Sequence, residues 1–364
     1  MEIQTKLLDP KETTAFALRA LYHSFGYRFF KMSKFESYDL YVQNRSFLVG
    51  ENILTFTDLS GRLMALKPDV TLSIIKNYTG GQQKVYYHEN VYREGSGAHE
   101  FSEIMQAGLE CIGQIDLYTQ YEILTLAAKS LECISRDTIL DVASVGLLRG
   151  LLAATKTDEQ TRQSLLGYVR GKNAHNILSL CREKELPEPV SRLWQQAATL
   201  YGPAVECLEA LRPQCVNEEM AAACDELSAL CRIARDGGLR LNLDCSIVSD
   251  LDYYNGLVFK GYVQGLHTRI LSGGRYDGLV QKMGKNAGAI GFAVYLDLLG
   301  QLTDQSIGSD TDVLLRYGAE ADVAEVMAKA QALRAKGLTV RVQQSDYDGP
   351  AAETIHLEGG ADRD

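Results

Sequence analysis

The chain has 364 residues, enough for two or three domains that each bury a hydrophobic core. Hydrophobic residues make up 46% and charged residues 23%, as in ordinary globular proteins, and no apolar run approaches the ~18 residues that a membrane-spanning helix needs. The 47 Asp and Glu outnumber the 37 Lys and Arg, and the net charge of −10 opposes rather than attracts a nucleic-acid backbone.

The first part of the chain, residues 1–145, combines helical and β-type patterns. Apolar residues at helical spacing from 10 to 25, followed by Gly26, predict a helix that ends in a glycine cap. Short β-type runs separated by turn residues favour an antiparallel sheet with hairpins; these runs are 27–30, 53–57, 63–66, 85–87, 91–93 and 103–112. Residues 115–134 have the periodicity of an amphipathic helix.

The middle of the chain, residues 146–239, changes to a Leu- and Ala-rich helical pattern that Pro187, Pro189 and Gly202-Pro203 interrupt. We interpret it as a helical insertion. β-type sequence resumes at 239–248, 257–263 and 270–274. The predicted core domain therefore combines residues 1–145 with residues 240–305, because strands that follow the insertion complete the first sheet.

The last part, residues 311–364, predicts a βαβ unit. A strand at 313–316 and a helix at 323–336 are followed by Gly337 and a second strand at 338–342. The unit is too short to be a complete independent domain.

The cysteines and the beginning of the chain indicate the cellular context. Eight cysteines occur without a CxxC pair, which predicts free thiols and neither a zinc site nor a disulfide framework. The first residues lack the basic and apolar stretches of a secretory signal. We therefore expect a cytoplasmic protein that does not associate with a membrane.

Three segments, in order, carry a family resemblance. They are LMALKPDVT (63–71), VYREGSGAHEFSEIMQAGLECIG (91–113), and the group LDYYNGLVFKGYVQG, SGGRYDGLVQKMG and AIGFAVYLDLL (251–299). Together they resemble the catalytic core of histidyl-tRNA synthetase, a class II aminoacyl-tRNA synthetase, over about residues 20–300. The resemblance implies an α+β fold, with a six-stranded antiparallel sheet, flanking helices, a site on the face of the sheet, and a dimer. It also implies that residues 311–364 are a truncated anticodon-binding-like module.

The resemblance implies an amino-acid site. In that family a carboxylate after the proline of the first segment receives the ammonium group of the amino acid, and Asp69 stands there with Thr71 beside it. Gln106 and Glu110 match residues that share this work, and residues two or four apart in a strand point to the same face. Carboxylates and an amide give an ammonium group charge-assisted hydrogen bonds. The alternative for Glu110 is a solvated position on the sheet.

Tyrosines and an arginine complete the candidate set. Tyr254 matches the tyrosine that reaches the substrate imidazole, and Tyr253 precedes it at an Asn-Gly turn that we expect to form a hairpin. Tyr276 is interpreted instead as a residue at the edge of the core. Arg93 stands at the position of a synthetase arginine, with a structural ion pair as its alternative role. The candidate ligand-binding residues are therefore Asp69, Thr71, Arg93, Gln106, Glu110, Tyr253 and Tyr254.

Two arginines of a working synthetase are absent. The arginine that contacts the carboxylate and the α-phosphate during adenylate formation is replaced by Ser249, beside the acid Asp250. The arginine that clamps the γ-phosphate of ATP is replaced by Leu298. Losing one charge-stabilising donor costs about 3 to 4 kcal/mol in a transition state. We therefore expect a pocket that binds a ligand without catalysis, and no catalytic residue, cofactor or metal.

A closer resemblance is to the regulatory subunits of ATP phosphoribosyltransferase in histidine biosynthesis. The KPD and SGGRYD motifs, QAGLE (106–110) and VGLLRGLL (145–152) are similar to that family. The resemblance implies a non-catalytic regulatory subunit that binds a short-form ATP phosphoribosyltransferase catalytic subunit and confers activity and histidine feedback on it. It implies partnership with a second copy of the chain, with histidine as a candidate ligand, and the acidity and the truncated module argue against tRNA. The alternatives are a divergent histidyl-tRNA synthetase and an orphan paralogue that binds another amino acid.

Overall fold

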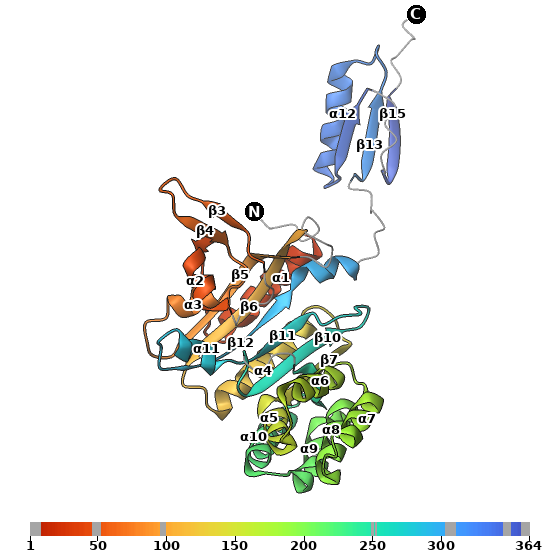
Figure 1. Cartoon of the computed structure of the whole chain (residues 1–364). Coiled ribbons are helices and arrows are strands. Elements are labelled where there is room, and N and C mark those ends of the chain that lie inside the picture. The colour runs from red at the N-terminus through yellow and green to blue at the C-terminus, as the bar shows by residue number, and fades with distance from the viewer. Residues whose placement is uncertain are drawn as a thin grey trace, which may run out of the picture. The chain divides into compact units, whose positions relative to one another are not determined.

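The computed structural model describes residues 9–45, 52–94, 100–248, 251, 253–302, 311–344 and 351–357. The chain divides into two compact units, residues 1–302 and residues 303–364 (Figure 1).

A nine-stranded sheet forms the centre of the first unit, in the order β1-β5-β6-β12-β11-β10-β7-β9-β8. Six central strands pair antiparallel with one another, as the resemblance implies; they are β5 (Gln83–Glu94), β6 (Phe101–Gly113), β12 (Gly288–Tyr295), β11 (Leu271–Arg275), β10 (Leu257–Val263) and β7 (Thr138–Ser144). The edges add β1 (Arg28–Phe29) parallel to β5, β9 (Asn242–Asp244) parallel to β7, and β8 (Tyr201–Pro203) antiparallel to β9.

Two helices pack their apolar residues against this sheet. α1 (Pro10–Ser24) begins with a capping box between Asp9 and Glu12, and the turn after it contains Gly26 at φ +82°, as predicted. α4 (Leu117–Glu132) confirms the predicted second helix, and its first turn is capped by the side chain of Asp116. Both helices contribute buried residues to the largest hydrophobic cluster of the protein.

Shorter elements form a second hydrophobic cluster on the opposite face of the sheet, together with residues of the long strands that alternate with those of the first cluster. They are the three-stranded sheet of β2 (Phe35–Ser37), β4 (Leu63–Leu66) and β3 (Thr55–Thr57), together with α2 (Tyr38–Gln43), α3 (Thr71–Lys76) and α11 (Asp277–Lys282). The runs 85–87 and 91–93, which the sequence separates, are parts of the single strand β5. Polar residues between them interrupt the apolar pattern, but pairing with β6 holds the whole strand extended.

Helices dominate residues 145–236, as the composition predicts. They are α5 (Val145–Thr155), α6 (Glu159–Arg170), α7 (Ala174–Glu183), α8 (Glu188–Thr199), α9 (Ala204–Leu211) and α10 (Glu218–Asp236), with short 3₁₀ helices η3 (Arg212–Gln214), η4 (Cys245–Ile247) and η5 (Leu296–Gln301) in this unit. The fully buried Trp194 donates a hydrogen bond of 2.9 Å from Nε1 to Oγ1 of Thr155. These helices share one hydrophobic cluster with the central sheet.

The second unit is a small parallel α/β module with its own core. β13 (Val313–Tyr317), α12 (Val323–Ala335) and β14 (Val340–Gln343) match the predicted βαβ unit, and Gly337 has φ +81°. A third strand, β15 (Glu353–Leu357), pairs in parallel with the other side of β13 and is absent from the sequence prediction. Only Ile355 and Leu357 of its five residues are apolar, so the local strand signal is weak.

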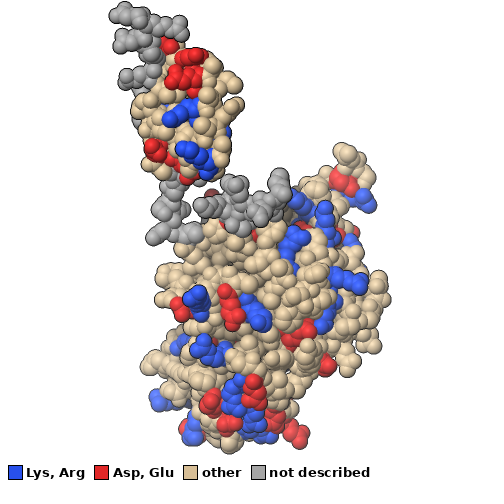
Figure 2. Space-filling model, turned by 180° about the vertical axis from the view of Figure 1, so that it is seen from behind, with Lys and Arg blue, Asp and Glu red and all other residues tan. Residues whose placement is uncertain are grey.

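Charges of both signs are mixed on the face of the molecule that Figure 2 shows. The helices in the described ranges are each too short or too polar to span a bilayer. Within the same ranges, no group of three or more His, Cys, Asp or Glu is arranged to hold a metal ion.

Candidate functional site

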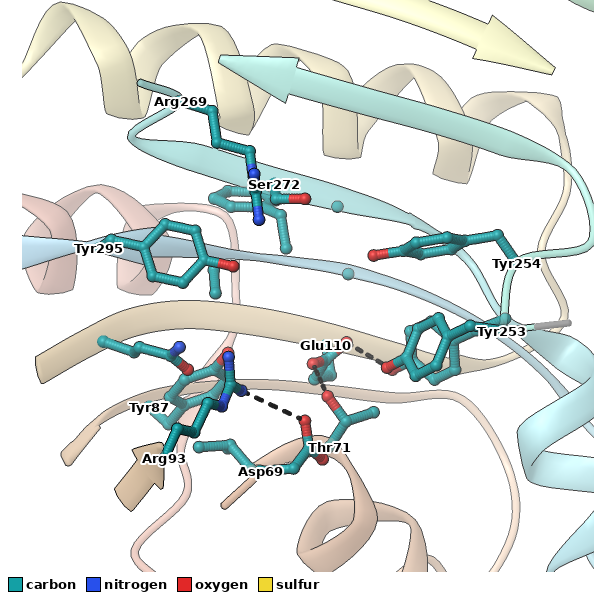
Figure 3. Close-up of a pocket in the computed structure, with 17 residues that line it drawn as sticks. Asp69, Thr71, Tyr87, Arg93, Glu110, Tyr253, Tyr254, Arg269, Ser272 and Tyr295 are labelled. Atoms are coloured by element: carbon teal, nitrogen blue, oxygen red, sulfur yellow. Dashed lines mark hydrogen bonds and ion pairs between the residues drawn. The ribbon is translucent and has the colours of Figure 1, made fainter. Parts of the chain in front are cut away.

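A cavity of about 340 Å³ lies against the central sheet, a size typical of small-molecule sites (Figure 3). All seven candidate residues line it: Asp69, Thr71, Arg93, Gln106, Glu110, Tyr253 and Tyr254. Ten further residues line it that the sequence did not select: Val70, Tyr87, Arg269, Ser272, Gly273, Tyr276, Gly291, Phe292, Ala293 and Tyr295. Segments from six separate parts of the chain therefore meet at one cavity.

Local structure explains how the acidic side of the cavity is positioned. Asp69 lies between β4 and α3, where its Oδ1 accepts a hydrogen bond of 2.9 Å from the backbone N–H of Leu72. Thr71 is the first residue of α3. Gln106 and Glu110 both lie on β6 and both line the cavity, as the two-residue strand period predicts.

Glu110 is buried, with 3% of its surface exposed, so the solvated alternative is wrong. Thr71 donates a hydrogen bond of 2.9 Å from Oγ1 to Oε1 of Glu110, and the Tyr276 hydroxyl donates to Oε2. Burial raises the pKa of Glu110 to about 8, although the hydrogen bonds from Tyr276 and Thr71 favour the charged form. This carboxyl group is therefore mostly neutral at pH 7.

The structure corrects the interpretation of Tyr276 as a residue at the edge of the core. It is 2% exposed, and its hydroxyl reaches the carboxyl group of Glu110 inside the cavity. The sequence could not indicate this contact, because β6 and the segment after β11 become neighbours only through the register of the sheet.

Glycines on the central strands leave room for these side chains. A Cβ atom on Gly274 would lie 2.6 Å from the ring of Tyr254, and one on Gly108 would lie 2.7 Å from Cζ of Tyr87. Both distances are shorter than real Cβ contacts. The glycines of QAGLE and SGGRYD therefore make space for the tyrosines that line the cavity.

Arg93 lines the cavity and also makes the structural contacts that were its alternative role. Its Nε donates a hydrogen bond of 2.6 Å to the backbone oxygen of Pro68, and its Nη2 lies 3.9 Å from Oδ2 of Asp69. Burial raises the pKa of Asp69, and the charge of Arg93 opposes this effect. Arg93 thus holds the turn that carries Asp69.

The Asn-Gly turn beside the tyrosines does not form the predicted hairpin. Neither Asn255 nor Gly256 has a positive φ, and β10, which follows them, pairs with β7 and β11. The segment is instead held by Arg149, whose Nη2 donates to the backbone oxygen atoms of Leu251 and Tyr254. The arginine of VGLLRGLL therefore positions the tyrosine segment from α5.

Tyr253 and Tyr254 pack edge to face, with ring centroids 4.7 Å apart, and Tyr253 also contacts the ring of Tyr276 at 5.8 Å. Burial raises the pKa of both Tyr253 and Tyr254 above the ordinary tyrosine value. Their hydroxyl groups therefore remain protonated and available as neutral hydrogen-bonding groups.

Two polar groups at the cavity have unused hydrogen-bonding capacity. Gln106 is 3% exposed, and its buried Nε2 has no hydrogen-bond partner among the described residues. Arg269 is exposed at the rim of the cavity, and no hydrogen bond or ion pair joins it to the other described residues. Sequence reasoning missed Arg269, because a single arginine between two strands has the pattern of a solvated loop residue.

Leu298 and Ser249 stand at the positions of the two absent arginines. Leu298 lies in η5, packs against the main hydrophobic cluster and does not line the cavity. Its neighbour Asp297 accepts from Lys11 Nζ at 3.0 Å and from the backbone N–H of Met105. Ser249 and Asp250 lie outside the described residues.

Comparison with known proteins gives consistent results. A family model described as histidyl-tRNA synthetase matches residues 8–299. ATP phosphoribosyltransferase regulatory subunits from Clostridium kluyveri and Caldanaerobacter subterraneus are each 29% identical to this chain, over 93% of it and 90% of the relative.

Solved structures show the same fold. An ATP phosphoribosyltransferase regulatory subunit/histidyl-tRNA synthetase from Bacillus halodurans superposes with a TM-score of 0.77 at 22% identity, covering 99% of this chain and 100% of the other. A chain of an ATP phosphoribosyltransferase complex from Thermotoga maritima gives 0.62 at 17% identity, covering 81% of this chain and 97% of the other. A histidyl-tRNA synthetase from Nostoc gives 0.69 at 17% identity, covering 93% and 83%.

Proposed function

This chain belongs to the histidyl-tRNA synthetase family, and we propose that within it the chain is a non-catalytic regulatory subunit of ATP phosphoribosyltransferase, acting in the first step of histidine biosynthesis. The names of relatives that match 93% of the chain support this function. The observation that carries it is a cavity that keeps its buried ligand-binding groups while Leu298 replaces an ATP-binding arginine.

The purified protein is expected to show no histidine-dependent exchange between ATP and pyrophosphate. Ser249 and Leu298 cannot stabilise the charge that develops on phosphate, and each lost donor costs about 3 to 4 kcal/mol. An active histidyl-tRNA synthetase assayed in parallel is the positive control. Exchange on the order of 1 per second or faster would instead support a divergent synthetase.

The partner is a short-form catalytic subunit of ATP phosphoribosyltransferase. Co-expression is expected to yield a complex in which transferase activity exceeds that of the catalytic subunit alone and falls when histidine is added. The control is the same catalytic subunit co-expressed with an unrelated protein of similar acidity. Failure of the two chains to co-purify, or equal activity with and without this chain, would favour an orphan paralogue.

The ligand of the cavity is a free amino acid, and histidine is the amino acid that the pathway supplies as feedback. Asp69, Glu110 and Thr71 offer acceptors for its ammonium group or ring N–H, and Tyr253 and Tyr254 offer neutral hydroxyl groups beside them. The net charge of −10 opposes tRNA as a partner.

A second copy of the chain is also proposed as a partner. Large apolar side chains are exposed near the edge strand β1 of the central sheet, namely Phe16 of α1 at 52% and Phe29 of β1 at 45%. Arg19 lies over the rings of Phe16 and Phe29. Light scattering is expected to give twice the chain mass of 40.2 kDa, and a mass of one chain at all concentrations would exclude the dimer.

A further inference from the structure

We propose that Arg269 binds the carboxylate group of the amino acid in the cavity, in place of the arginine that the chain lacks at position 249. This inference rests on the proposed function, because it assigns a residue to the ligand of the same cavity. It names the ligand as a zwitterion with a free carboxylate group.

The carboxyl groups and the amide of Gln106 together favour a ligand that carries both a positive charge and a hydrogen-bond acceptor. Asp69 and Glu110 bring two carboxyl groups into a mostly buried space, and a purely cationic ligand would satisfy them. The unpartnered Nε2 of Gln106 cannot be satisfied in this way, because an amide N–H needs an acceptor. An amino acid supplies both an ammonium group and a carboxylate acceptor within one small molecule.

Arg93 is not free to be the main carboxylate-binding residue. Its Nε is used by the backbone oxygen of Pro68 at 2.6 Å, and its Nη2 faces Asp69 at 3.9 Å. Its side chain is 13% exposed, so turning toward a ligand would leave the Pro68 oxygen and the Asp69 carboxyl group without it.

Arg269 has the position and the freedom that Arg93 lacks. It precedes β11 by two residues, and Figure 3 shows its side chain extending toward the cavity from the side opposite Asp69. Ser272 and Tyr295 line the cavity on the same side. No carboxyl group within the described residues forms an ion pair with Arg269, so its guanidinium group is available for a ligand.

A second basic side chain, Lys260, lies close enough to Arg269 for their charges to interact. Lys260 lies on β10, directly across from Ser272 of β11. Burial and then the charge of Arg269 lower the pKa of Lys260 to about 8. A ligand carboxylate at Arg269 would reduce this repulsion between like charges, and its binding would thereby be favoured.

Two ligands, one with and one without a carboxylate group, provide the test of this inference. L-Histidine and L-histidinol share the ammonium group and the imidazole ring, but histidinol has an alcohol where histidine has the carboxylate. Calorimetry with the full-length protein, alone and in complex with the transferase, gives the affinity of the parent and of Arg269→Gln for both ligands. Arg240→Gln, which changes an exposed arginine outside the cavity, is the matched control.

Arg269→Gln is expected to weaken histidine binding on the order of 10-fold and to leave histidinol binding unchanged, because only histidine has the carboxylate. Arg240→Gln is expected to change neither. Unchanged histidine affinity in Arg269→Gln, or an equal loss for both ligands, would overturn the inference while the regulatory function stands. Failure of the parent to bind histidine or any other free amino acid would overturn both this inference and the proposed ligand, whereas the co-expression assay tests the partner separately.

Discussion

Replacing Lys67 with Met is expected to lower the free energy of unfolding of the first unit by about 3 to 5 kcal/mol. The side chain of Lys67 is completely buried, and its Nζ lies 2.6 Å from Oε2 of Glu89, which is 14% exposed. Removing the ammonium group leaves the Glu89 carboxylate without its partner in a poorly hydrated position. The lysine of the KPD motif is thus a structural residue beside the cavity and is not one of its lining residues.

The measurement is denaturant unfolding followed by the fluorescence of Trp194, the single tryptophan of the chain, which is buried in the first unit. The double variant Lys67→Met with Glu89→Gln is expected to recover most of the loss, because neither charge then remains buried. Arg212→Met, which breaks an exposed ion pair with Asp225, is expected to cost less than about 1 kcal/mol. A cost that small for Lys67→Met would show that the buried pair is not important for stability.

The structure also shows why some strands were predictable from the sequence and others were not. The runs at 103–112 and 257–263 are long, apolar and bounded by turn residues, so local pattern alone identified β6 and β10. β7 was missed because Asp141 interrupts its apolar pattern. Asp141 is buried, and its Oδ1 accepts hydrogen bonds of 3.4 Å from the hydroxyl of Tyr201 and from Nδ2 of Asn242.

Some residues of the site could likewise be predicted from local sequence motifs, whereas others belong to it only through the tertiary structure. Asp69, Gln106 and Glu110 were found because short motifs carry them and strand periodicity groups the last two. Tyr276 and Arg269 have no such local signal. They belong to the site because β11 and β12 pair beside β6, and no spacing within one segment encodes that arrangement.

Glu110→Gln is expected to weaken histidine binding at pH 8 by about 10-fold to 150-fold, since a charged hydrogen bond is worth roughly 1.5 to 3 kcal/mol. The amide keeps the size of the side chain and one acceptor oxygen but removes the charge. Glu159→Gln, at an exposed side chain that is 70% accessible, is the matched control and is expected to change nothing. Calorimetry on the full-length protein, and histidine inhibition of the transferase complex, provide two independent readouts.

The same carboxyl group is expected to make histidine binding depend on pH. The pKa of Glu110 is about 8, raised mainly by burial, so the group is mostly protonated at pH 7. A bound N–H donor or cation favours the carboxylate and lowers this pKa, so binding releases a proton below pH 8. Affinity should therefore rise with pH, by about 5-fold between pH 7 and pH 8, and level off above the pKa. This window lies above the titration of the histidine imidazole, near pH 6.5. Asp69, whose pKa is also raised by burial, and the ammonium group of the ligand titrate as well, so the comparison with Glu110→Gln isolates the contribution of Glu110.

The folding stability of the protein without ligand depends on pH in the opposite direction, because it falls as the pH rises. A carboxyl group whose pKa is raised in the folded state contributes stability that is fully present below its unfolded pKa, near 4.5, and that is lost as the pH rises through about 8. Glu110→Gln should remove both pH effects, because the amide does not titrate. If the variant folds normally but keeps the parent's histidine inhibition and its pH dependence, histidine acts elsewhere, at the contact with the catalytic subunit. The cavity would then have no part in histidine feedback, while the assignment of the chain to its family would still hold.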